Sequence, residues 1–279
     1  MNAIHMSSRP PESASGALSC WRRGTRLFLR APVKLFVLAA LAQYALLLPD
    51  WLPAITGSAI SGLSGLFVSA AAIWLAALCY AALILQIDVL AAGGRAGWRQ
   101  AARAALSLAV AGVIYNVAVA IGLVLLLLPA VFFSIALLFF AWPIVLEGRG
   151  PLAALGQSWR WTLPRFGRVS AAISIAFLVY GAYSVLTWWP SIAGVAWQPL
   201  AVLLAAVRDG AVGPMTAAIQ AQSLVVPGPV AAPVWYFGMN PLLGGLVMPP
   251  VLAVLYEVYC RLRAAETQTQ AEAAASAAS

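Results

Sequence analysis

The feature that most constrains this chain is an apolar stretch from Ala104 to Leu146 that contains no charged residue. A single helix of this length would be about twice as long as the hydrocarbon core of a bilayer is thick. The stretch must therefore turn, and Pro129-Ala130 is the position where a helix is most easily interrupted. We expect two antiparallel transmembrane helices here, over 104–128 and 131–146, joined by a very tight turn.

The composition of the whole chain also indicates a bilayer as its solvent. Hydrophobic residues make up 63% of the chain and charged residues only 9%, whereas a soluble domain of this length carries about 25% charged residues. Four further apolar runs are predicted to span the membrane, over 31–48, 63–87, 169–189 and 242–259. With the two helices above, they predict an all-α, polytopic membrane helix bundle of about six transmembrane helices.

Two of these predicted spans have unusual features. The first span is short, and Lys34 would have to extend its side chain toward the lipid headgroups. The last span contains Gly244, Gly245, Pro249 and Pro250, which predict a kink or a partly unwound turn.

The remaining segments divide the chain into a membrane domain and two tails. Residues 1–15 are polar and rich in Ser and Pro, which predicts a disordered N-terminal tail. Residues 16–263 form the predicted six-helix membrane domain, and 264–279 form a low-complexity C-terminal tail with some helix near the membrane. Between the last two spans, 192–226 contains two short apolar runs that fit interfacial helices, a re-entrant hairpin or two further spans.

The basic residues give the predicted spans an orientation. The chain has 16 basic and 8 acidic residues and a net charge of +8. With six spans, every basic residue except Arg208 falls on one side, which the positive-inside rule assigns to the cytoplasm. We therefore expect a multi-pass protein of the bacterial inner membrane with both termini in the cytoplasm. Because the basic residues cluster beside apolar runs, we expect anionic lipids of the cytoplasmic leaflet as partners, and no nucleic acid.

A Trp-Arg pair precedes each odd-numbered predicted span. Tryptophan prefers the headgroup region, and a further arginine follows each pair four or five residues later. Each segment is thus predicted to be an amphipathic helix on the cytoplasmic surface, followed by a transmembrane hairpin, so that one unit occurs three times. The alternative is that the pairs are separate membrane-surface anchors. The paired residues are Trp21 and Arg22, Trp98 and Arg99, and Trp159 and Arg160.

Acidic residues end the even-numbered predicted spans at the same cytoplasmic level. These residues are Asp88, Glu147 and Glu257, and Arg160 and Arg261 lie close to them in the sequence. Carboxylates and guanidinium groups at one depth are able to bind a zwitterionic or phosphate headgroup. They are equally able to form internal ion pairs that position the helices, and Glu257 and Arg261 have the favourable i, i+4 order for such a pair.

Several classes of chemistry are not supported by the sequence. The three cysteines have no CxxC spacing, and His5, the only histidine, lies in the polar tail, so we expect no metal, no cofactor and no disulfide framework. The P-loop, GxSxG and HExxH motifs are absent from the sequence, so no catalytic residue is predicted. The middle of the spans contains a few neutral polar residues, including Gln43, Asn116 and Tyr180, and Asn116 is expected to bond between helices.

The stretch 147–159, with the sequence EGRGPLAALGQSW, resembles a signature at the end of the fourth helix in bacterial six-helix families of unknown function. It is similar to that of YciC-like proteins and of the membrane domain fused to some glycerophosphodiester phosphodiesterases. Arg30-Ala31-Pro32, 126–129 and Leu255-Tyr256 fit other motifs of the same pattern. The resemblance implies a six-helix fold and a loose association with lipid metabolism or the membrane surface, and it implies no activity.

The signature also has a local physical interpretation. Gly148 and Gly150 are suited to end a helix, and Pro151 is suited to the first position of the next one. Glu147 would then lie near the N-terminus of that next helix, where it is expected to act as a cap that accepts free amide N–H groups.

These patterns predict a non-enzymatic membrane protein that organises lipids or a protein partner, including another copy of itself, at the cytoplasmic leaflet. The alternative is a transporter or lipid translocase whose gate is a broken sixth helix together with 192–226. An intramembrane enzyme is the third hypothesis, and it requires a cavity that joins Asp88, Glu147 and Glu257.

Overall fold

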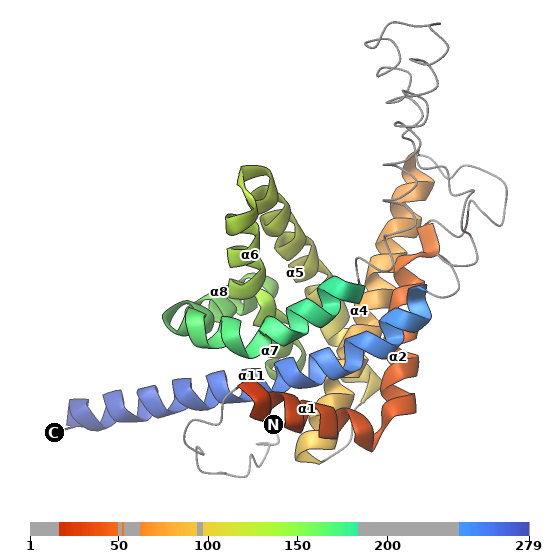
Figure 1. The fold of residues 1–279 in the computed structure, drawn as a ribbon. Helices are drawn as coiled ribbons and strands as arrows, with labels where there is room; N and C mark the ends of the chain where they lie inside the picture. The colour runs from red at the N-terminus through yellow and green to blue at the C-terminus, as the bar shows by residue number, and fades with distance from the viewer. Residues whose placement is uncertain (1–16, 50–51, 53–61, 94–96, 184–239, 279) are drawn as a thin grey trace, which may run out of the picture.

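The computed structural model describes residues 17–49, 52, 62–93, 97–183 and 240–278. Within these ranges the chain is helical and contains no strand, so the predicted all-α class is confirmed (Figure 1). The predicted segment 192–226, the last part of the predicted fifth span and the N-terminal tail lie outside the described residues.

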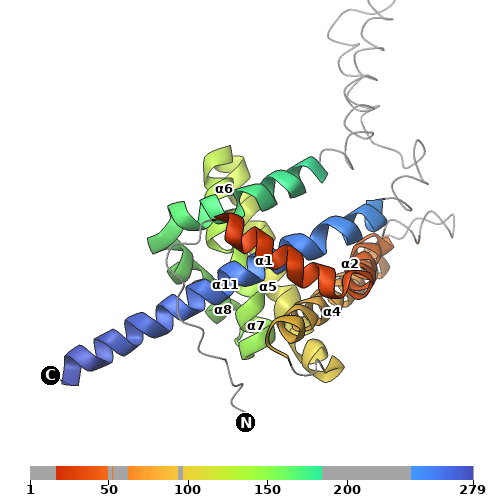
Figure 2. The same ribbon diagram turned by 60° about the horizontal axis from the view of Figure 1, so that its bottom comes forward.

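The first two helices form an L. Helix α1 (Ala17–Arg30) and helix α2 (Pro32–Leu46) are bent by 93° at Ala31. The cause is local, because a residue that precedes proline is disfavoured in the helical region, and Ala31 has φ −150° and ψ 57°. Pro32 then starts α2 at a position where its missing N–H costs nothing. Helix α1 lies beside α11 in both views (Figure 1 and Figure 2).

The long charge-free stretch turns as predicted, but three residues earlier than expected. Helix α5 (Trp98–Leu125) ends at Leu126, and α6 (Leu127–Ala136) follows at once. Pro129 lies in the first turn of α6, where the backbone N–H has no intrahelical partner in any case, so it does not break the helix. The close approach of the two helices requires Gly122, because a Cβ there would lie 2.8 Å from the amide nitrogen of Ala130.

The span after this turn is interrupted and then reverses. Helix α6 is followed by the 3-10 turn η1 (Leu138–Phe140) and by α7 (Ala141–Glu147). Gly148 ends α7 with φ 69°, in the left-handed region that favours glycine, and Pro151 occupies the first turn of α8 (Pro151–Thr162). The predicted roles of these two residues are therefore confirmed. A second 3-10 turn, η2 (Leu163–Arg165), leads into a helix over 166–183.

The last helix is longer than the predicted span. Helix α11 (Asn240–Ala278) is uninterrupted through Pro249 and Pro250, so of the two predicted alternatives, a kink or a partly unwound turn, the unwound turn is not observed. Its N-terminal half packs tightly on α2, because a Cβ on Gly245 would lie 2.8 Å from the Cβ of Ala40. Proline fixes φ near its helical value, and this contact supports the segment around the lost hydrogen bonds. Beyond the bundle, α11 continues as a projecting helix through most of the low-complexity tail (Figure 1).

The chain is a multi-pass integral membrane protein. Among the described residues, five helices are long and apolar enough to cross a bilayer, with mean hydropathies between 1.4 and 2.4, and the bent pair α1–α2 makes up to six. These helices overlap the predicted spans wherever the structure describes the chain. Their bounds are Gly62–Ala92 (α4), Trp98–Leu125, Leu128–Glu147, Pro151–Tyr183 and Asn240–Ser276.

The predicted threefold repeat of a surface helix followed by a hairpin is not present. Helix α1 is separated from its span, but Trp98 and Arg99 begin α5 itself, without any turn. Helix α8 is a separate element, yet its face with Gln157 and Thr162 is buried in the bundle. The three segments differ because of their prolines. Pro32 and the proline of η2 interrupt the helix after α1 and after α8, whereas 98–125 contains no proline.

Candidate functional site at the basic end of the bundle

The segments rich in basic residues meet at one end of the bundle. A guanidinium nitrogen of Arg30 donates a hydrogen bond to the carbonyl of Leu90 at 2.8 Å, which joins the end of α1 to the end of α4. The side-chain amide of Gln100 donates to the carbonyl of Val145 at 3.2 Å, which joins the start of α5 to the end of α7. We call this region the basic end; it comprises α1, the last turn of α4, the first two turns of α5, the end of α7 and residues 256–266 of α11.

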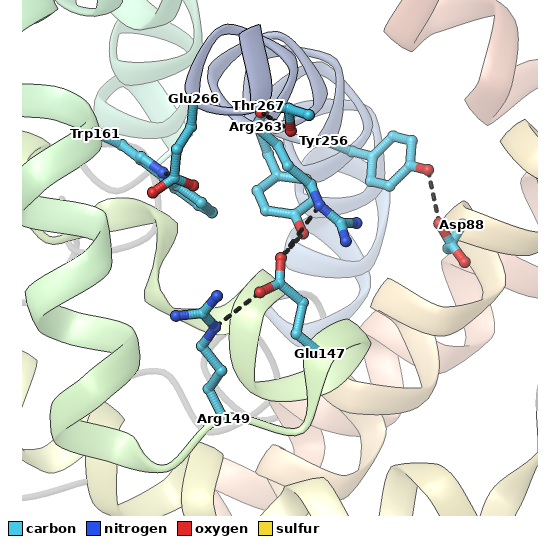
Figure 3. A network of polar contacts seen from close by, with 9 residues as sticks. Asp88, Glu147, Arg149, Trp161, Tyr256, Arg263, Glu266 and Thr267 are labelled. Atoms are coloured by element: carbon cyan, nitrogen blue, oxygen red, sulfur yellow. Dashed lines mark hydrogen bonds and ion pairs between the residues drawn. The ribbon is translucent and has the colours of Figure 1, made fainter. Parts of the chain in front are cut away.

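Asp88 is held inside the basic end by a tyrosine. The hydroxyl of Tyr256 on α11 donates a hydrogen bond to a carboxylate oxygen of Asp88 on α4 at 2.7 Å (Figure 3). Both side chains are at least half-buried. A short bond to a carboxylate is among the stronger hydrogen bonds in proteins, so this contact joins the two helices firmly.

Glu147 is the centre of a larger set of contacts. The hydroxyl of Tyr259 donates to Oε1 of Glu147 at 2.9 Å, Nε of Arg149 lies 2.8 Å from Oε2, and Nε of Arg263 lies 3.4 Å from Oε1 (Figure 3). The side chain of Glu147 is only 13% exposed. The N-terminus of α8 has no side-chain cap, so the predicted capping role of Glu147 is wrong. The carboxylate of Glu147 instead contacts α11. Of the two interpretations of Glu147, internal ion pairing is the one observed.

Four polar residues form a stripe along one face of α11. Tyr256, Tyr259, Arg263 and Glu266 are spaced by three, four and three residues, which places them on one side of a helix. The indole N–H of Trp161 on α8 donates to Glu266 at 2.7 Å. The stripe thus contacts α4, α7 and α8 in turn (Figure 3). The stripe is absent from the sequence-based predictions, although its spacing of three and four residues at the end of the last span was a usable signal.

The opposite face of α11 packs on α1. A guanidinium nitrogen of Arg261 donates to the hydroxyl of Ser19 at 2.8 Å. Burial raises the pKa of the Cys20 thiol on α1, and among the nearby charges Arg261 opposes this shift while Glu257 adds to it. Glu257 and Arg261 therefore belong to the contact with α1, on the side of α11 away from Asp88 and Glu147.

The predicted anchors of α1 and α5 are placed differently by the fold. Trp21 is half-buried, with its indole N–H buried and unpartnered within the described residues, whereas Arg22 is exposed. Trp98 is 64% exposed at the start of α5, and Arg99 beside it is exposed. Both arginines therefore face outward from the basic end.

The third predicted pair lies on α8. Trp159 packs edge-on against the ring of Phe132 at 5.4 Å and lies 6.2 Å from that of Phe133, so it contacts α6 within the bundle. Arg160 is exposed, and it forms no ion pair with any residue that the structure describes. The structure does not bring Arg160 together with Asp88, and its role as a headgroup ligand stays a prediction.

A second polar group lies away from the basic end. The amide of Gln43 on α2 donates to the hydroxyl of Tyr80 on α4 at 2.8 Å, and the hydroxyl of Tyr183 donates to the side chain of Asn240 at 2.7 Å. These bonds join spans that are distant in the sequence. Asn116, by contrast, donates to the carbonyl of Gly112 in its own helix, so the predicted interhelical bond is wrong.

The contacts described at the basic end pair helices with one another. In the described part of the chain, no group of three His, Cys, Asp or Glu side chains converges to hold a metal ion. Asp88 and Glu147 each accept a hydrogen bond from a different tyrosine of α11. Comparison of the chain with protein-family models, with curated proteins and with solved structures found no match in any of the three.

Proposed function

We propose that this protein is a non-enzymatic component of the bacterial inner membrane that organises anionic lipids at the cytoplasmic leaflet. One observation carries the proposal. The carboxylates Asp88 and Glu147 are engaged inside the bundle, whereas five arginines of α1 and α5 at the basic end are exposed. One of the five, Arg30, bonds to the carbonyl of Leu90, which leaves four. Within the described residues these four form no ion pair. They are Arg22 and Arg26 on α1 and Arg99 and Arg103 on α5.

The chemistry of these side chains favours lipid phosphates as ligands. A basic side chain near an anionic leaflet contributes about 1 kcal/mol of attraction. A guanidinium group also donates two parallel hydrogen bonds to a phosphate, a geometry that the ammonium group of lysine does not offer. Because the nearest acidic groups are bonded inside the bundle, they do not compete for these arginines.

The proposal places the basic end in the cytoplasm, with both chain termini on that side. The support is the asymmetry of the basic residues together with the contacts that gather their segments at one end. A reporter that is active only in the cytoplasm, fused after the last residue, is expected to be active. Activity of a periplasmic reporter at the same place would reverse the orientation.

Two alternatives lose support. The translocase hypothesis relied on a broken sixth helix together with 192–226; α11 is continuous through Pro249 and Pro250, and 192–226 lies outside the described residues. The enzyme hypothesis relied on three convergent carboxylates, and Glu257 lies on the face of α11 that packs on α1. A protein partner at the basic end is the outcome that competes most directly with lipid binding.

The test is extraction of the full chain from native membranes into polymer nanodiscs, followed by mass spectrometry of the retained lipids and proteins. We expect anionic lipids to be enriched over the bulk membrane. Reversal of the four exposed arginines to glutamate should abolish the enrichment, while Glu272→Lys, in the projecting part of α11, should preserve it. Bulk lipid composition around the unmodified chain, or a stoichiometric protein companion in its place, contradicts the proposal.

A further inference from the structure

An apolar groove lies between two of the long helices. Its volume is about 340 Å³, within the range of small-ligand sites, and all of its lining side chains are hydrophobic. Figure 1 shows α4 and α5 together at the basic end and separated toward the other end. The lining residues are Ala70, Ile73 and Trp74 of α4, and Leu106, Ala109, Val110, Val113 and Ile114 of α5.

Two exposed arginines continue the line of this groove. On α5, Arg99, Arg103, Leu106, Val110 and Val113 follow one another at steps of four, three, four and three residues. This spacing keeps all five on one face of the helix. The face is therefore basic at the basic end and apolar along the groove, and the two parts form one continuous surface.

The dimensions of this surface match one leaflet of a bilayer. Ten residues separate Arg103 from Val113, which corresponds to about 15 Å along a helix axis. Half of the hydrocarbon core of a bilayer is also about 15 Å thick. A molecule with an anionic group at the level of Arg99 and Arg103 and an apolar tail of one leaflet's length fits both parts.

From this geometry we infer that the groove and its two arginines form a binding site for one anionic phospholipid. The guanidinium groups of Arg99 and Arg103 hold the phosphate, and one acyl chain lies in the groove against the indole of Trp74. The inference rests on the proposed function and goes further, because it assigns one place, one class of lipid and a stoichiometry of one. It predicts that the other exposed arginines attract lipids without selecting a single bound molecule.

The first test uses native mass spectrometry of the full chain in a neutral detergent. Phosphatidylglycerol and phosphatidylcholine with identical acyl chains are titrated separately. We expect one phosphatidylglycerol to be retained in preference to phosphatidylcholine. The variant Arg99→Ala/Arg103→Ala should weaken this binding about tenfold or more, since each hydrogen-bonded charge is lost. The control variant Arg165→Ala/Arg168→Ala removes two arginines elsewhere and should leave the retained lipid unchanged.

The second test fills the groove while the arginines stay in place. Val110, which is 44% exposed in the groove, is replaced by Trp, and Val124, which is 87% exposed on the same helix outside the groove, is replaced by Trp as the control. We expect Val110→Trp to weaken phosphatidylglycerol binding and Val124→Trp to have no effect. Because Val110 is exposed, the variant should keep its melting temperature, which separates loss of the site from loss of the fold.

The outcomes separate the inference from the proposed function. The lipid site is overturned if the two lipids are retained equally, or if binding survives both Arg99→Ala/Arg103→Ala and Val110→Trp. It is also overturned if the observed mass corresponds to two chains in place of one chain with lipid. If anionic lipids are still enriched in nanodiscs in that case, the proposed function stands without this site. If nanodiscs show no such enrichment, both proposals fail together.

Discussion

The hydroxyl of Ser158 accepts a hydrogen bond from the backbone N–H of Phe139 at 3.0 Å, at the point where a membrane span leaves the α-helix. The same hydroxyl donates to the carbonyl of Ala136 at 2.9 Å. The two backbone groups lie on either side of the break between α6 and η1. Inside a bilayer, such groups have no water to bond with, so a single buried serine of α8 satisfies both. The serine of the 147–159 signature is therefore part of the fold.

Replacement of Ser158 by Ala should lower stability more than any other single serine change in the described chain. It leaves the N–H of Phe139 and the carbonyl of Ala136 buried without partners, and the expected loss is about 2 kcal/mol. The measurement is thermal or SDS unfolding in detergent. Ser174→Ala is the control, because that exposed hydroxyl bonds only to a carbonyl of its own helix. Equal stability of the two variants would contradict the role assigned to Ser158.

The contact between α1 and α11 depends on a glycine. A Cβ on Gly24 would lie 2.7 Å from both Cγ2 and the amide nitrogen of Val254, so Gly24→Ala must push the helices apart. Overpacking of this kind costs about 1–3 kcal/mol. We expect Cys20 of α1, which is 2% exposed, to be alkylated by maleimide about tenfold faster in this variant. Peptide mass spectrometry distinguishes Cys20 from the other two cysteines.

The matched control for this experiment is Gly156→Ala. A Cβ at Gly156 meets no atom within 4 Å, and the glycine is exposed on α8. Alanine is the better helix former, so this change should be neutral or slightly stabilising. An unchanged alkylation rate at Cys20 in Gly24→Ala would show that α1 and α11 do not pack as described.

Docking of α1 should weaken at alkaline pH. Burial raises the pKa of Cys20 above its ordinary value of 9.0, so the folded state favours the neutral thiol. A raised pKa gives stability that is complete below pH 9.0 and is lost as pH rises through the pKa of the folded state. The melting temperature of the unmodified chain should therefore fall relative to that of Cys20→Ala as pH is raised above this value. A difference that is constant with pH would argue against burial of the thiol.

The bond between Tyr259 and Glu147 should appear as a coupling energy. In a double-mutant cycle with Tyr259→Phe and Glu147→Gln, we expect about 1.5 kcal/mol, because the hydrogen bond involves a charged acceptor. The arginines beside Glu147 are 42% and 37% exposed, so removing the charge alone should cost less than removing the whole carboxylate by Glu147→Ala. As a control, the exposed pair Gln268 and Glu272 on α11 should show a coupling near zero.

Local features of the sequence explain the bends that prolines impose, but they do not tell which prolines remain inside a continuous helix. The bend at Ala31 and the start of α8 at Pro151 follow from backbone restrictions of single residues. Pro249 and Pro250 obey the same restrictions, yet α11 stays helical there because its contact with α2 holds the segment. A local rule therefore predicts where a helix is weak, and the neighbouring helices decide whether it breaks.

The sequence by itself determined the class of the protein and the approximate position, along the chain, of the spans that the structure describes. These properties follow from hydropathy and charge summed over about 20 neighbouring residues, because a bilayer requires each crossing segment to satisfy its own backbone. Only the tertiary structure decided which groups pair, as Tyr259 does with Glu147 across 112 positions and Tyr256 with Asp88 across 168. Such pairs depend on how each helix is rotated about its axis, and that rotation is set by close packing between helices rather than by any local pattern.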